Sequence, residues 1–179
     1  MDGEPAIHLR QWQDGDLPRF GEMNAYPEVM RYFLKPLSPA ESAAAMQRFR
    51  EGIAQRGWGL WAVEVNGVFA GFTGLSEPPF ESAFTACVEI GWRFRPEYWG
   101  RGIAYRAARE AEAYAFRELK LPELVSFTTE SNLRSRRLME RLGFSRNPEE
   151  DFHHPLVPAG HPLIRHVLSR KSALHPSHP

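Results

Sequence analysis

Two glycines after an aromatic strand pattern could bind an anion. The stretch "EIGWRFRPEYWGRGIA", residues 89–104, alternates apolar and polar side chains, then contains Gly100 and Gly102, and then enters an alanine-rich helix. A strand, a glycine turn and a helix start, in this order, present unpaired backbone N–H groups at the positive end of a helix dipole. These groups, from about Gly100 to Tyr105, predict a site for a pyrophosphate.

Other interpretations of the glycine turn fit less well. A Walker phosphate loop needs lysine and then serine or threonine after its second glycine, where this chain has Ile103 and Ala104. A dinucleotide fingerprint needs a third glycine at Tyr105 and normally follows the first strand of its unit. A tight turn that needs glycine only for its backbone angles is the simplest alternative. The helix that follows the glycines is the feature that favours an anion site over a purely structural turn.

Glu89 is the first candidate for proton transfer. Side chains alternate along a strand, so Glu89 shares one face with Arg93, while Ile90, Trp92 and Phe94 share the other. The alternation alone fits a solvent-exposed glutamate without a catalytic role as well as it fits a general base. A partly desolvated carboxylate would instead have a raised pKa, in the range that suits a general base for an ammonium substrate.

Ser135 is the second candidate. In the helix pattern "SNLRSRRLMERLGF", residues 131–144, Ser135 shares a face with Leu138, Met139 and Leu142. The hydroxyl should therefore point inward. The alternative is a serine of the first turn that bonds only to the backbone.

The two quoted motifs and the order of elements resemble the GCN5-related N-acetyltransferases, and within them the ribosomal-protein N-terminal acetyltransferases. The resemblance extends from Ile7 to about Arg170, and the motifs lie the family's distance apart. The family's phosphate loop matches at Gly102 and Ala104, whereas Trp99 replaces the usual glutamine or arginine. The resemblance implies an α/β fold in which helices flank a mixed, mostly antiparallel sheet that is split near the strand before the glycine turn.

The resemblance also implies acetyl-CoA as co-substrate. The pyrophosphate would lie on the amides of the glycine turn, and the pantetheine chain along the strand before it. The implied binding residues are Trp92, Arg93, Phe94, Arg95, Gly100, Arg101, Gly102, Ile103, Ala104, Tyr105 and Asn132. Arg106 could add charge at the rim, together with Arg95 and Arg101.

The implied reaction is direct attack of a primary amine on the thioester, with Glu89 as general base. Backbone N–H groups near Ile90 to Trp92 would stabilise the oxyanion. Many family members protonate the leaving thiolate with a tyrosine where this chain has Met139, so Ser135 is the expected substitute. The acceptor could be a protein or peptide N-terminus or a small-molecule amine, with substrate loops at 24–38 and 149–162. A non-catalytic acyl-CoA sensor with the same fold is the alternative.

Composition sets the remaining expectations. The 179 residues suit one domain, 1–179, with a flexible tail at 172–179. Basic and acidic residues balance at 22 each, which argues against nucleic acid as a partner. We expect no membrane segment or signal peptide, a cytoplasmic location given the single Cys87, and no metal, since the histidines lack paired-ligand spacing. A homodimer is left open.

The predicted elements are strands near 6–12, 60–65, 68–75, 85–94, 124–129 and 163–170, with a further strand starting at 144. Helices are predicted to begin near 14 and to cover about 38–57, 102–120 and 130–144. Asn66-Gly67 predicts a tight hairpin turn.

Overall fold

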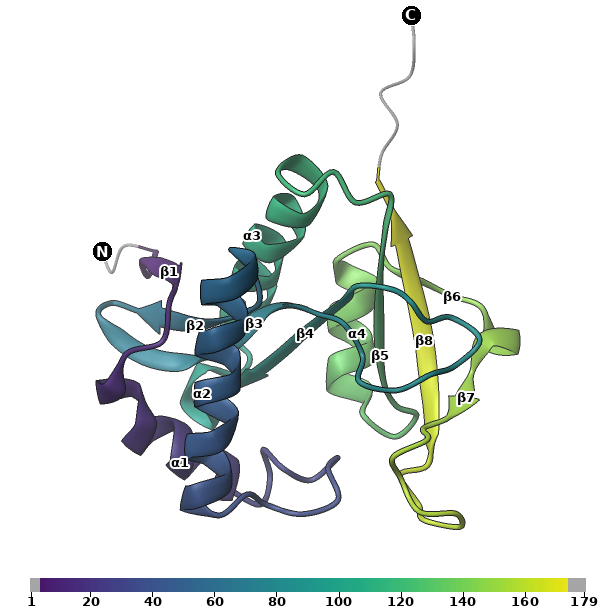
Figure 1. Ribbon diagram of the computed structural model, residues 1–179, viewed down its shortest axis with the longest axis horizontal. Coiled ribbons are helices and arrows are strands. Elements are labelled where there is room, and N and C mark those ends of the chain that lie inside the picture. Colours follow the sequence, from purple (N-terminus) through teal and green to yellow (C-terminus); the bar gives the residue numbers. More distant parts are fainter. Residues whose placement is uncertain (1–3, 174–179) are drawn as a thin grey trace, which may run out of the picture.

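The computed structural model describes residues 4–173, and eight strands of this part form one mixed sheet (Figure 1). Seven strands follow one path, in the order β1 (Ile7–Arg10), β2 (Leu60–Val65), β3 (Val68–Ser76), β4 (Glu89–Phe94), β5 (Glu123–Thr129), β8 (Arg165–Ser172) and β6 (Ser145–Arg146). The short β7 (Phe152–His153) also pairs with β8. Every pairing is antiparallel except that of β4 with β5.

The sheet splits between β4 and β5. These strands share a single register pair, Glu89 with Val125, whereas β3 and β4 pair over the whole length of β4. Beyond Glu89 the two strands diverge, as Figure 1 shows. The backbone of residues 90–94 therefore has no strand partner on the β5 side, and a cavity opens there.

Two layers of helices cover the sheet. The first pair is α1 (Leu17–Ala25) and α2 (Pro39–Arg56), and the second pair is α3 (Ile103–Arg117) and α4 (Leu133–Arg141). The first pair packs on Ala62, Phe69 and Phe72, while the second packs on Leu75 and Ile90. Neighbouring residues of a strand face opposite sides, so Glu89 and Arg93 lie on the α1–α2 side and Ile90 lies on the α3–α4 side.

Local sequence signals place α2 and the hairpin as predicted. The Ser38 side chain accepts a hydrogen bond from the Glu41 backbone N–H, and the Glu41 carboxylate accepts one from Ser38 in return. Gly57 ends the helix with φ of +79°. The hairpin turn at Asn66 and Gly67 has positive φ at both residues.

Several predicted boundaries were wrong, among them those of β4, α3 and β8. β4 begins at Glu89 instead of residue 85, because the preceding segment is a loop whose Phe80 and Phe84 pack on Phe127. α3 ends at Arg117, three residues before Lys120, which has φ of +54°. β8 continues to Ser172, and the remainder of the expected tail, 174–179, lies outside the described residues. No helix within residues 4–173 is long and apolar enough to cross a membrane.

Candidate active site

One cavity of about 1050 Å³ lies where the sheet splits. Its floor contains the whole of β4, from Glu89 to Phe94, and part of β5. The glycine turn and α4 form one wall. The other wall comes from the loop between α1 and α2, near residues 28–34, and from the segment after β7, near residues 154–163. The two segments expected to hold substrate loops thus meet at this cavity.

The glycine turn presents free backbone N–H groups to the cavity. The N–H groups of residues 100–105 donate to no backbone carbonyl in the described part of the chain. Gly100 and Gly102 have φ of +69° and +75°, and a Cβ atom added to either would meet nothing within 4 Å. Trp99 fixes the start of the turn by donating from its indole to the Phe94 carbonyl at 2.9 Å. The turn therefore offers a cradle that suits a pyrophosphate.

Arginines of α4 supply the cations beside this cradle. The Arg134 guanidinium lies 3.8 Å from the centre of the Trp99 ring, and Arg141 lies 4.7 Å from that of Tyr105. Arg137 lines the same wall. We did not identify these three residues from the sequence, although their spacing of three and four places them on one helix face.

The arginines that the sequence analysis placed at the rim have other contacts. Arg95 forms ion pairs with Glu97 and Glu22, at 2.7 and 3.5 Å. Arg106 lies 3.5 Å from Glu4 and donates to the Pro5 carbonyl. Arg101 is exposed and donates to the Glu97 carbonyl. The charges of Arg95 and Arg106 are thus compensated within the protein.

Glu89 lies at the point where the sheet splits. Its side chain is partly enclosed by protein, lines the cavity and has no ion-pair partner within the described residues. Desolvation raises the pKa of the Glu89 carboxyl to about 8. A carboxyl with this pKa is mainly protonated at pH 7, with about a tenth of the molecules ionised, and the ionised form is a stronger base than an ordinary carboxylate.

Ser135 faces the cavity from the first turn of α4, and its hydroxyl oxygen accepts a hydrogen bond from the Trp92 indole at 3.1 Å. Its backbone N–H donates to the side-chain oxygen of Asn132, which caps the helix. The Asn132 amide nitrogen donates to Thr128. Because Trp92 is the donor to Ser135, the serine hydroxyl keeps its own proton free for another acceptor.

Met139 does not face the cavity. Its side chain is 2% exposed and packs between α3 and α4 with Leu142 and Phe144. Leu138 and Ser135 line the cavity from this helix instead.

Sequence comparison identifies the family of this chain. Residues 6–145 match the model described as the acetyltransferase (GNAT) domain. The chain belongs to this family. The FsC-acetyl coenzyme A-N(2)-transacetylase of Aspergillus fumigatus is 37% identical over 93 residues, which cover 50% of this chain and 40% of that protein. The spermidine N(1)-acetyltransferase of Escherichia coli K12 is 27% identical over 81% of this chain and 76% of that protein.

Solved structures show the same fold. A GNAT-family acetyltransferase from Bacillus anthracis superposes with a TM-score of 0.76 at 20% identity, covering 95% of this chain and 97% of that one. The expectation of an α/β GNAT fold with an open, mostly antiparallel sheet is thus confirmed. The chain spans less than half the length of the Aspergillus fumigatus relative.

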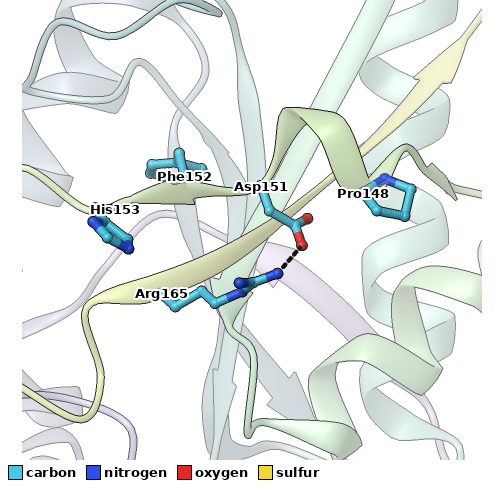
Figure 2. Close-up of a pocket in the computed structure, with 5 residues that line it drawn as sticks. All are labelled: Pro148, Asp151, Phe152, His153 and Arg165. Carbon is cyan, nitrogen blue, oxygen red and sulfur yellow. Dashed lines mark hydrogen bonds and ion pairs between the residues drawn. The ribbon is translucent and has the colours of Figure 1, made fainter.

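The GNAT domain has a second, smaller pocket at the β7–β8 edge (Figure 2). This pocket has a volume of about 440 Å³ and is lined by Pro148, Asp151, Phe152, His153 and Arg165. Asp151 pairs with Arg146 and, at 3.4 Å, with Arg165. Its bond with Arg146 holds the pKa of the Asp151 carboxyl below its ordinary value. The charged groups of this smaller pocket thus form ion pairs, whereas Glu89 has no ion-pair partner within the described residues.

The histidines of this part of the GNAT domain are divided between the two pockets. His153 lies at the smaller pocket, while His154 and His166 line the larger cavity with their rings 4.8 Å apart. Burial lowers the pKa of His166 to about 4, so the ring is neutral at pH 7. Within residues 4–173, no group of three histidine, cysteine, aspartate or glutamate side chains could hold a metal ion.

Proposed function

We propose that this protein is an enzyme that transfers the acetyl group of acetyl-CoA to a primary amine. The observation that carries the proposal is the place of Glu89. A carboxyl with its pKa raised to about 8 lies where the sheet splits, in the same cavity as an unpaired glycine turn. Family membership and relatives named as acetyltransferases support the same reaction.

Acetyl-CoA would be bound from the α3–α4 side. The N–H groups of residues 100–105 would donate to its pyrophosphate, and Arg134, Arg137 and Arg141 would compensate the phosphate charge. The pantetheine chain would pair with the backbone of Trp92 to Phe94, which has no β5 partner. From Arg93, only the backbone has this role, since its side chain faces the opposite layer. Asn132 would contribute from the cap of α4.

Glu89 would act as the general base. Its carboxylate takes a proton from the ammonium group of the acceptor, directly or through water, and the freed amine attacks the thioester carbonyl carbon. The C–N bond forms first and turns the carbonyl oxygen into an oxyanion, and the C–S bond breaks when this tetrahedral intermediate collapses. Backbone N–H groups of β4, near Ile90 to Trp92, would stabilise the negative oxygen that develops between these steps.

Ser135 would protonate the departing thiolate. The Trp92 indole holds the serine oxygen at 3.1 Å and leaves the hydroxyl proton free. The Ser135 hydroxyl can give this proton to the sulfur and regain one from solvent. The attacking nitrogen would lose its second proton to solvent, and Glu89 would release there the proton that it took, so that the enzyme returns to its starting state.

Two classes of acceptor amine have support. A protein or peptide N-terminus would agree with the resemblance to the ribosomal-protein N-terminal acetyltransferases, in which a tryptophan before glycine, as at Trp99 and Gly100 here, looks typical. A small-molecule amine would agree with the spermidine N(1)-acetyltransferase among the relatives. The cytoplasm, where acetyl-CoA is available, is the location that we propose.

A CoA-release assay tests the proposal. Purified protein is incubated with acetyl-CoA and a panel of peptides, polyamines and other small amines, and free thiol is followed over time. We expect amine-dependent release, together with thermal stabilisation by acetyl-CoA and none by NAD. Stabilisation by acetyl-CoA without release for any amine would favour the non-catalytic sensor instead.

A further inference from the structure

Arg93 is a partly buried cation that has no anionic partner among residues 4–173. Its guanidinium donates from Nη1 to the side-chain oxygen of Asn24 at 2.7 Å and lies 4.2 Å from the centre of the Phe33 ring. Its Nε atom is buried and has no hydrogen-bond partner within the described residues. No carboxylate in this part of the chain lies within 4.0 Å of it.

This arrangement is costly for a folded protein. Buried charges are usually paired, because a charge removed from water loses its hydration without regaining it elsewhere. Burial accordingly lowers the pKa of Arg93 to about 10. One amide and the faces of Phe33 and Phe72 compensate only part of this loss. A ligand anion could supply the rest.

Arg93 and Glu89 share one face of β4 and line the same cavity. Gly91 is the residue between them on this face, and a Cβ atom added to it would meet only a Glu89 carboxylate oxygen, at 3.9 Å. No side chain on the strand therefore separates the two charged groups. With a strand rise of about 3.3 Å per residue, their Cα atoms lie about 13 Å apart, and both side chains can approach one small molecule.

We propose that the acceptor is a primary amine that also carries a carboxylate, with its amine toward Glu89 and its carboxylate toward Arg93. This inference rests on the proposed acetyltransferase function and adds its substrate class. The carboxylate would accept hydrogen bonds from Arg93, while the middle of the molecule would lie over Gly91.

The charges of the cavity disfavour a polyamine in this position. Glu28 and Glu89 are the only carboxylate side chains among the described residues that line the cavity, and Glu28 is exposed. A second ammonium group held at the Arg93 end would meet a like charge without a nearby anion. An amino-carboxylate matches both ends of the site, which have opposite charge.

Matched acceptors test the inference. Amines of the same chain length are compared that end in a carboxylate, a methyl or a second ammonium group, and the length of the chain is varied. We expect kcat/KM to be highest for the ω-amino acids and lowest for the diamines, with a difference of about tenfold or more between carboxylate and methyl at the best length. Equal or better turnover of the alkylamines or diamines at every length would overturn the inference.

Variants link the preference to Arg93. In Arg93→Gln, we expect kcat/KM for the best ω-amino acid to fall about tenfold relative to kcat/KM for the matching alkylamine, because only the carboxylate loses its partner. Arg48→Gln is the matched control, since it removes the same charge from an exposed site of α2 outside the cavity. Retention of the full carboxylate preference in Arg93→Gln would contradict the inference.

A binding measurement separates this inference from the proposed function. The alkanoate without an amine group cannot react, but it should stabilise the CoA-saturated protein in a thermal melt. We expect this stabilisation in the parent and in Arg48→Gln, and its loss in Arg93→Gln. The result does not depend on turnover, so it still decides the inference if no amine is acetylated. Equal stabilisation of the parent and of Arg93→Gln by the alkanoate would overturn it.

Discussion

Trp92 and Ser135 join β4 to α4 across the split in the sheet. The indole N–H of Trp92 donates to the Ser135 hydroxyl oxygen at 3.1 Å, on the α3–α4 side of β4. Glu89 lies on the opposite face of the same strand. The proposed base and the proposed acid are thus held on the two sides of β4, which suits a reaction in which the amine reaches the acetyl carbon from one side of the strand and the thiolate leaves on the other.

The glycine turn gives the first prediction. Gly102→Val should weaken acetyl-CoA binding about tenfold or more, because the side chain would extend toward the pyrophosphate and would strain a residue with φ of +75°. Isothermal titration with acetyl-CoA measures the effect. Gly57→Val is the control, since Gly57 has φ of +79° and equally open surroundings but lies outside the cavity. Equal affinities of the two variants would argue against this binding site.

The proposed base gives the second prediction. Glu89→Gln should bind acetyl-CoA normally but lose about 10²–10⁴-fold in kcat, the range attributed to a positioned acid or base. Steady-state CoA release with the best amine measures the loss. Glu110→Gln, at an exposed site of α3, serves as the control. If Glu89→Gln is as active as the parent, Glu89 is a surface glutamate and not the general base.

The raised pKa of Glu89 gives the third prediction. A base is active when deprotonated, so kcat/KM of the parent should rise about tenfold per pH unit up to about pH 8 and then level off. Without the carboxyl, Glu89→Gln depends on the free amine, so its kcat/KM should keep rising above pH 8 toward the pKa of the amine. The ratio of the parent profile to that of Glu89→Gln, measured from pH 6 to 9, therefore isolates the carboxyl. A flat ratio would show that Glu89 does not govern the pH dependence.

The same carboxyl should affect stability. In the folded protein the pKa of the Glu89 carboxyl is about 8, above its ordinary value of 4.5. The contribution of this carboxyl to the free energy of unfolding is therefore complete below pH 4.5 and is lost as the pH rises toward 8. Urea unfolding should accordingly show Glu89→Gln gaining stability relative to the parent between pH 5 and 8. Glu110→Gln should show no such trend. A constant difference between Glu89→Gln and its parent across this range would contradict the raised pKa.

Local patterns predicted most of the fold. The capping box at Ser38 and the glycine pair of the hairpin fix their elements through contacts within a few residues, so the sequence alone located them. The start of β4 was misplaced because it depends on distant packing. Phe80 and Phe84 belong to an aromatic cluster with Phe127 of β5 and with Phe152, which no local pattern reveals.

The site was predicted in part for the same reason. The place of the glycine turn follows from the order of elements. Strand alternation left Glu89 equally well explained as a solvated glutamate, and only the family resemblance made it a candidate base. The ion pairs of Arg95 and Arg106 join segments far apart in the chain, so their compensation was not visible in the sequence. The α4 arginines were visible as a helix face, but only the fold shows that this face meets the glycine turn.

Ser135 gives the last prediction. Ser135→Ala should reduce kcat about tenfold, or about 1.4 kcal/mol of transition-state stabilisation, with little change in KM for acetyl-CoA. The effect should be smaller than that of Glu89→Gln, because a thiolate can leave unprotonated. Ser131→Ala, an exposed serine just before α4, is the control.

The contact with Trp92 makes this prediction more specific. Trp92→Phe removes the donor to the Ser135 oxygen without removing the serine proton, so it should lower kcat less than Ser135→Ala does. A tyrosine at position 139 should not restore activity, because Met139 is buried between α3 and α4 and a larger side chain would overpack this core. If Ser135→Ala turns over like its parent, the hydroxyl only accepts the Trp92 bond, and the thiolate takes its proton from water.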